Sequence, residues 1–476
     1  MSHTPLPRRH WSRATAVVLA TTVSLGALTS CTTSPSPGDA AATDGSAVTT
    51  TAGSLFDSSQ VHDVAVTFDE ADYTAMIEAY TSTGDKSWIS ATVTVDGVVF
   101  EEVGLRLKGN SSLRGVSADA DPTTMPWLVR LDKYVDGQEL DGVTSFVVRS
   151  STTTTALNEA VALELIGLSG LATQRATPTR FSINGGDAVL RLVIENPDDT
   201  WAEAVFDTDG VLYKSEAEGS WAYQGDDPES YAESFDQETG DEEDLTPLIG
   251  FLEWLDTSDD ATFAAELTDH LDVDAFATYL AVQDLVDNFD DISGPGNNSY
   301  LRYDAETGVF TVVSWDQNLS FGTMGGGGMP GEAGAGREMP EGMTFPEGAT
   351  PPEGFDPPDA TAVPDGVAPT DGIVPTDGPT LPGGGGEPPA GFEPGGRMGQ
   401  DGGLGGNVLA ERFMADDGFA ALYDAALAGL TASLYDSGTA ADVLATWTEV
   451  LTSQASDLVD AGTITQEAAA IATYWE

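Results

Sequence analysis

Residues 323–407 set the strongest limit on how this chain can fold. The segment is dominated by glycine, proline, glutamate, aspartate and methionine, and it shows no apolar periodicity. Such a composition cannot bury enough apolar surface to offset the entropy of ordering, so we expect a disordered insertion. The folded part must therefore come from the residues before the insertion and from residues 408–476, which we expect to form a C-terminal helical tail of the same domain.

The first 30 residues resemble the signal peptide of a bacterial lipoprotein. A basic stretch precedes an apolar run, and residues 28–31 (LTSC) are similar to a lipobox. Cys31, the only cysteine, would then carry the lipid and anchor the chain to the cell membrane on its extracytoplasmic side. The alternative is an ordinary cleaved signal with a chance cysteine. Residues 31–60, rich in small and polar residues, are expected to form a flexible tether.

The charge of the chain limits its partners. Asp and Glu number 78 against 18 Lys and Arg, which gives a formal net charge of −60. A surface of this sign repels nucleic acid and anionic lipid headgroups and favours cations. We therefore exclude nucleic acid as a partner.

Alternating apolar and polar residues predict a strand-rich N-terminal lobe over residues 61–246, with a hairpin turn at Asp96-Gly97. Within it, residues 155–168 are expected to be a helix that buries Leu157, Val161 and Leu165. Residues 247–322 are predicted to form a helical lobe that also contains a catalytic loop and a metal-binding hairpin.

One helix of this second lobe is predicted in more detail. Asp272 is its expected N-cap, and Val273, Phe276 and Leu280 form its inward stripe.

Residues 284–322 carry the pattern that points to chemistry. A helix leads into residues 288–291 (NFDD), two short strands follow, and the second strand ends at Trp315-Asp316. Carboxylates and a carboxamide thus flank a predicted hairpin. Metal-assisted phosphoryl transfer uses such a set, with one acid for the nucleophile and an Asn and a second acid for magnesium.

The order of motifs resembles the CotH family, whose fold is similar to that of atypical protein kinases. The matching segments are residues 105–112 (LRLKGNSS), 192–195 (LVIE), 210–214 (GVLYK), 288–290 (NFD), 297–298 (NN) and 315–322 (WDQNLSFG). Two departures from the family pattern matter most: Asn297 replaces a His, and Asn318 replaces the second acid of W-D-x-D. The resemblance implies an α+β, atypical protein-kinase-like two-lobed fold with a strand-rich N-terminal lobe and a helical C-terminal lobe.

The resemblance also assigns roles to the acids near the hairpin. Asp316 and Asn298 would hold Mg²⁺, and Asp290 would orient or deprotonate an acceptor hydroxyl. For one acid among 78, exposed surface is the default interpretation. The position of these residues around a hairpin favours a site, and the N-x-D register favours Asp290 over Asp291.

The chain has four lysines to contact the phosphates of ATP: Lys86, Lys108, Lys133 and Lys214. We expect Lys214, which ends a strand of the first lobe, to bind the cofactor, with Glu195 or Glu159 as its ion-pair partner. Lys108 and Arg106 are the alternatives. A surface lysine is the other interpretation of Lys214.

The predicted function is ATP- and magnesium-dependent transfer of phosphate to Ser or Thr hydroxyls of a protein substrate, outside the cytoplasmic membrane. Two alternatives remain. The chain could be a non-catalytic, pseudokinase-like lipoprotein that binds or assembles components of the cell envelope, or a metal-dependent hydrolase that uses the same acids.

Overall fold

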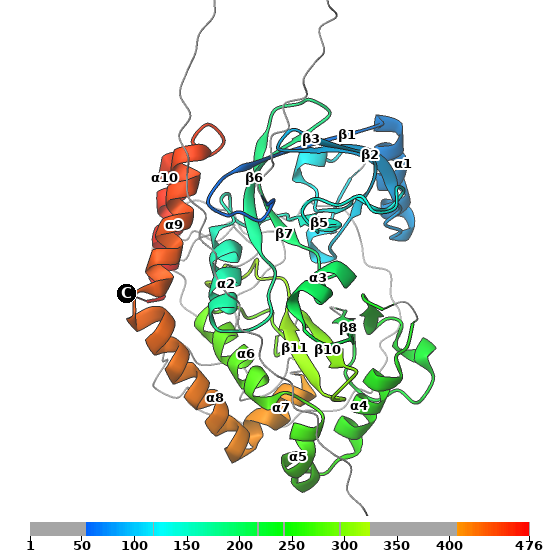
Figure 1. Ribbon diagram of the computed structural model, residues 1–476, viewed down its shortest axis with the longest axis vertical. Coiled ribbons are helices and arrows are strands. Elements are labelled where there is room, and N and C mark those ends of the chain that lie inside the picture. Colours follow the sequence, from blue (N-terminus) through cyan, green and yellow to red (C-terminus); the bar gives the residue numbers. More distant parts are fainter. Residues whose placement is uncertain are drawn as a thin grey trace, which may run out of the picture. The chain divides into compact units, whose positions relative to one another are not determined.

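The computed structural model describes residues 54–117, 119–216, 219–240, 243–294, 297–323 and 407–475. The predicted signal peptide, the lipidation site Cys31, most of the predicted tether and residues 324–406 of the predicted insertion lie outside these ranges. The described part is a mixed α+β structure with a strand-rich N-terminal region and a helical C-terminal part (Figure 1). No helix in the described ranges has the length and apolar character needed to cross a membrane.

Seven strands of the N-terminal region form a closed barrel in the order β1-β2-β3-β4-β5-β7-β6. Every neighbouring pair is antiparallel except β1 and β6, which pair in parallel and close the barrel. Buried and exposed residues alternate strictly along β1, as expected for a strand with one face toward a core. The strands are β1 (His62–Phe68), β2 (Ile89–Val95), β3 (Val98–Leu107), β4 (Trp127–Arg130), β5 (Ser145–Val148), β6 (Ala176–Ile183) and β7 (Val189–Glu195).

The predicted turn between β2 and β3 is confirmed. Asp96 and Gly97 both have positive φ, 47° and 84°, as a type I′ hairpin turn requires. Helix α1 (Glu70–Thr83), which lies between β1 and β2 in the chain, was not predicted. It is capped by Asp69, whose side chain accepts a hydrogen bond from the Ala71 amide at 2.7 Å.

A second sheet has the strand order β11-β10-β8-β9. It joins β8 (Gly210–Ser215) and β9 (Phe235–Gln237) to the predicted hairpin, which consists of β10 (Ser299–Asp304) and β11 (Phe310–Ser314). The sheet therefore takes strands from both predicted lobes. Its core packs with helices α4 (Thr246–Thr257), α5 (Asp260–Glu266), α6 (Val273–Leu285), α7 (Val408–Ala415) and α8 (Asp417–Leu430).

Helix α6 delivers the chain to the candidate site and begins as predicted. The Asp272 side chain caps it by accepting a hydrogen bond from the Ala275 amide at 3.0 Å. Phe276 and Leu280 are fully buried, whereas Val273 is half-buried at the first turn. The inward stripe therefore forms, and its first residue lies at the edge of the core.

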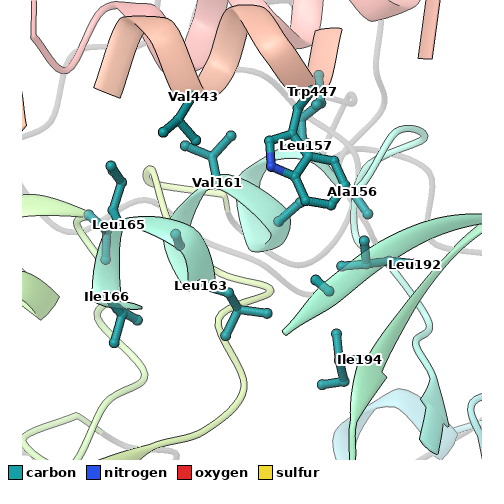
Figure 2. Packing of buried hydrophobic residues seen from close by; sticks show 14 of the residues in the cluster. Ala156, Leu157, Val161, Leu163, Leu165, Ile166, Leu192, Ile194, Val443 and Trp447 are labelled. Atoms are coloured by element: carbon teal, nitrogen blue, oxygen red, sulfur yellow. The ribbon is translucent and has the colours of Figure 1, made fainter. Parts of the chain in front are cut away.

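Helix α2 (Leu157–Leu168) confirms the predicted helix and connects the barrel to the C-terminal helices α9 (Thr439–Gln454) and α10 (Ala461–Ala472). Figure 2 shows Leu157 and Val161 of α2 facing Val443 and Trp447 of α9. Leu192 and Ile194 of β7 belong to the same buried cluster, so α2 is held between a barrel strand and the last helices of the chain (Figure 2).

Replacing Trp447 with Ala should lower the free energy of unfolding by about 3–5 kcal/mol, because it opens a cavity against α2. The Trp447 side chain is 3% exposed, and its Nε1 also donates to Glu164 Oε2 at 2.6 Å. Urea unfolding measures the loss. As a control, Leu168→Ala at a 53% exposed position of α2 should change stability by less than about 0.5 kcal/mol. Equal effects of the two substitutions would contradict this packing.

Candidate active site

The loop between α6 and β10 brings Asp290 and Asn298 into direct contact. The Asn298 side-chain nitrogen donates to the Asp290 carboxylate Oδ2 and to the Asp290 carbonyl oxygen, both at 2.9 Å. Two acceptors on one side fix the orientation of the amide, so its oxygen, Oδ1, faces away from Asp290. Both side chains are half-buried. The structure thus brings together two of the three residues predicted around the hairpin.

The third residue, Asp316, follows the other strand of the same hairpin. Ser299 of β10 pairs with Ser314 of β11, so Asn298 and Trp315 each lie one residue beyond the last pair, at the open end. Asp316 comes next, with a φ of +57°. A residue other than glycine adopts this left-handed conformation at a cost, and such residues are common at functional sites. Asn298 and Asp316 therefore extend from the same end of the hairpin.

A buried arginine joins Asp316 to helix α2. Arg149 directly follows β5, and its Nε lies 2.8 Å from Glu159 Oε1 in the first turn of α2. Its Nη2 contacts Asp316 Oδ1. The side chain of Glu159 is 1% exposed, that of Arg149 9% and that of Asp316 26%. The two carboxylates compensate the guanidinium charge, as a buried charge requires.

Protonation in this group follows from its surroundings. Burial lowers the pKa of Arg149, but the Asp316 and Glu159 carboxylates outweigh it and raise the pKa above the ordinary value. Burial raises the pKa of Glu159, the Arg149 charge opposes that rise, and the Asp316 charge adds to it. Arg149 is therefore the cation that allows two acids to lie close together here.

Lys108 and Arg149 both contact the indole ring of Trp315. The Lys108 ammonium lies 5.3 Å from the ring centroid and the Arg149 guanidinium 5.6 Å. Lys108 Nζ also donates to the Asn196 side-chain oxygen at 3.0 Å. Burial lowers the pKa of Lys108 to about 8, with Glu238 opposing the shift and nearby cations adding to it. Two cations thus lie beside the residue that precedes Asp316.

The other predicted cofactor residues have different partners from those expected. Lys214 contacts Glu216 rather than Glu195 or Glu159. Glu195 accepts from Arg175 Nη2 at 2.6 Å and from the Arg175 amide at 2.7 Å. The reason is register: Arg175 immediately precedes β6, whose first residue pairs with the neighbour of Glu195 on β7.

The four lysines nevertheless lie in one region of the fold. The net charge of the chain alone does not predict that they gather there. Arg106 and Lys133 both pack on the Trp88 ring, 4.8 Å and 5.0 Å from its centroid. The charges of Lys86 and Lys108 both interact with Lys214 and Arg106. We call Lys86, Arg106, Lys108, Lys133 and Lys214 the cation cluster. Acidic residues lie among its members, since the cluster also interacts with Glu216, Asp236 and Glu238.

The two loops of the site are joined by buried amides. Asn288 Nδ2 donates to Gln283 Oε1 at 2.9 Å and to Gln317 Oε1 at 3.3 Å. All three side chains are buried. The Phe321 amide also donates to the Val286 carbonyl at 2.6 Å. The N-x-D loop and the loop after β11 are therefore held side by side.

The two positions that depart from the family pattern have structural contacts. Asn297 accepts from Trp221 Nε1 at 2.9 Å and donates to the Glu216 carbonyl at 3.1 Å. The Asn318 carbonyl accepts from Thr152 Oγ1 at 2.9 Å and from Asn158 Nδ2 at 2.6 Å. Asp291, the residue after Asp290, is buried, and its carboxylate accepts a hydrogen bond from the Ser293 amide at 2.9 Å.

The available ligands suit magnesium better than a softer metal. Among the described residues, no group of three or more His, Cys, Asp or Glu could hold a metal ion. Asp316, Asn298 and Asp290 instead offer carboxylate and amide oxygens at one end of the hairpin. Mg²⁺ is usually held by one or two carboxylates and completes its shell with water and substrate phosphates. The side chains at this end of the hairpin therefore carry the ligand types that suit magnesium.

Comparisons with known proteins identify the family. Residues 105–353, just over half of the chain, match the family model described as CotH kinase protein. The inner spore coat protein H of Bacillus subtilis (strain 168) is 26% identical over 167 residues, which cover 34% of this chain and 45% of that relative. The match thus spans less than half of the relative's length. The chain belongs to the CotH kinase family, and this membership suggests kinase activity.

Sequence reasoning missed Arg149 and Asn196. Arg149 follows an apolar strand that is buried along its whole length, where a charge is costly unless it is paired. The place of an arginine directly after a buried strand was the signal in the sequence that this residue must be paired. Its partners could not be read from the sequence, because Asp316 lies 167 residues further along the chain.

Arg149→Met should lower the free energy of unfolding by about 3–5 kcal/mol, because it leaves the buried Glu159 without a counter-charge. Chemical denaturation measures this loss. Arg130→Met is the control: its ion pair with Asp132 involves an arginine side chain that is 50% exposed, so a change below about 1 kcal/mol is expected. A similarly small loss for Arg149→Met would show that the buried pair adds little.

Raising the pH from 8 to 10 should stabilise the wild-type protein relative to Lys108→Met. The folded-state pKa of Lys108, about 8, lies below its ordinary value of 10.5. Between these values the unfolded chain binds more protons than the folded chain, so this residue's contribution to stability rises with pH. Urea unfolding at pH 8, 9 and 10 tests the sign, and parallel pH curves for the two proteins would contradict it.

Proposed function

We propose that this chain is an atypical, two-lobed protein kinase that transfers phosphate from ATP to Ser or Thr hydroxyls of a protein substrate with the help of Mg²⁺. The supporting observation is Arg149, held by Glu159 of helix α2 and in contact with Asp316. Protein kinases use the same arrangement, in which a helix glutamate holds a basic residue near the metal-binding aspartate. Here the basic residue is an arginine.

The acids around the hairpin divide the work. Asp316 and the Asn298 oxygen that faces away from Asp290 would hold magnesium, which when bound neutralises charge on the phosphates. Asp290 would accept a hydrogen bond from the acceptor hydroxyl and orient it for attack. Its contact with Asn298 keeps its carboxylate beside the metal ligands.

The phosphates need cations, which are scarce in this chain. Lys108 and Arg149 lie on Trp315 next to Asp316, and we propose that they make the direct contacts. Lys214 and Arg106 belong to the same cation cluster and would attract the nucleotide electrostatically. Glu195 has no direct role in this proposal, because its carboxylate binds Arg175.

We also propose that the protein works outside the cytoplasmic membrane, anchored by a lipid on Cys31. The lipobox-like residues 28–31 support this location. The alternative function is a non-catalytic binding or assembly module of the cell envelope. It is favoured by Asn297 and Asn318, which replace two residues of the family pattern, and by the structural contacts that the Asn297 side chain makes with Trp221 and Glu216.

Asp290→Asn and Asp316→Asn should each reduce transfer of label from γ-³²P-ATP to casein by at least about 100-fold at saturating Mg²⁺, since each removes one role in phosphoryl transfer. Asp272→Asn is the matched control, because asparagine caps a helix as well as aspartate does, and it should keep full transfer.

The wild-type result separates the two functions. If purified protein transfers no label and shows no thermal shift with ATP and Mg²⁺, the kinase proposal is wrong and the binding module is favoured. Transfer that survives both Asp290→Asn and Asp316→Asn would place the chemistry elsewhere.

A further inference from the structure

The last helices of the chain return to the candidate site. Residues 439–475, which contain α9 and α10 and which we call the C-terminal brace, lie beside α2 in Figure 1. Their contacts reach the turn before α2, the loop after α6 and the loop after β11. The proposed mechanism uses none of the residues in this segment.

Glu467 of α10 holds the turn that begins α2. Its carboxylate accepts from the backbone amides of Thr154 and Thr155, both at 2.9 Å, and from the Thr155 hydroxyl. Ala156, the residue before α2, has a positive φ of 56°, and no side chain caps the helix at this position. The Thr153 and Thr155 hydroxyls accept from the Ala156 and Leu157 amides, and Glu467 supplies, from the other end of the chain, the acceptors for the Thr154 and Thr155 amides.

The turn held by Glu467 leads directly to the site. It connects Arg149 to Glu159, the two residues of the buried ion pair. It also binds the loop after β11, because Thr152 and Asn158 donate to the Asn318 carbonyl. A displacement of this turn would thus move Glu159 and the loop that carries Asp316 together.

A second contact of the brace reaches the loop after α6 and the loop after β11. The Tyr474 hydroxyl donates a hydrogen bond to Asp287 Oδ2 at 2.9 Å. The Tyr474 ring packs on Phe321, with the ring centroids 5.3 Å apart. A Cβ on Gly322 would come within 2.4 Å of the Tyr474 hydroxyl oxygen. Glycine at 322, with φ +62°, therefore allows the brace to approach the loops that carry Asp290 and Asp316.

We propose that the C-terminal brace sets the geometry of the site, with Glu467 and Tyr474 as positioning residues. Glu467 fixes the α2 turn and through it the Arg149–Glu159–Asp316 group. Tyr474 fixes Asp287 and Phe321 and through them the two loops. The effect on phosphate transfer rests on the proposed function, whereas the ordering of the loops does not.

Glu467→Gln should lower the kcat for phosphate transfer to casein about 10-fold and leave the KM for casein within twofold, because Glu467 lies on the α2 side and not at the acceptor. Thr155→Val should act through the same turn, so the double variant should lose little more than Glu467→Gln alone. Glu449→Gln, an exposed glutamate on α9, is the matched control and should keep wild-type kinetics.

Hydrogen–deuterium exchange tests the brace without any catalytic readout. In Glu467→Gln the amides of residues 152–158 should exchange at least about fivefold faster, while the barrel strands stay unchanged. In Tyr474→Phe the faster exchange should fall on residues 286–288 and 321–322. Tyr134→Phe, at a 48% exposed tyrosine, should change neither segment.

The outcomes are separable. Unchanged exchange in residues 152–158 of Glu467→Gln overturns the brace, whatever the wild-type activity. Faster exchange with unchanged kcat shows that the turn does not position the catalytic group, and it also overturns the proposal. Absent transfer in the wild type, with the predicted exchange changes present, rejects the kinase and retains the brace as the element that orders the loops.

Discussion

The candidate site depends on the ion pairs that the buried guanidinium of Arg149 makes. Arg149 links three separate parts of the chain, because the residue follows β5, Glu159 belongs to α2 and Asp316 follows β11. Burying a charge is expensive, and the cost is offset only when its partners are held in place. The barrel, the first turn of α2 and the second sheet must therefore adopt one relative arrangement for the charges to be compensated.

Trp315 adds cations to this arrangement. Its ring carries Lys108 and Arg149 on an apolar surface, which brings two cations to the neighbour of an aspartate. In a chain with a net charge of −60, an anionic nucleotide would be repelled by most of the surface. The cation cluster offers a local exception, and the acids among its members limit how strongly it attracts other anions.

Local signals in the sequence were sufficient for several elements. Asp96-Gly97, helix α2 and the cap at Asp272 depend on neighbouring residues, and the structure has all three. The barrel closure could not be predicted, because β1 and β6 pair across more than 100 residues. The motif order indicated where Asp290 and Asn298 would lie, whereas the partners of Lys214 and Glu195 depend on strand register, which composition does not determine.

The parallel pairing of β1 with β6 has a consequence for how the protein folds. The first strand begins at His62, but its partner is complete only at Ile183, so the growing chain holds an unpaired strand edge until that residue is available. Ring closure is thus a late, long-range event, and such events slow folding. A delay in this closure would leave the edge of the sheet exposed to pairing with neighbouring chains.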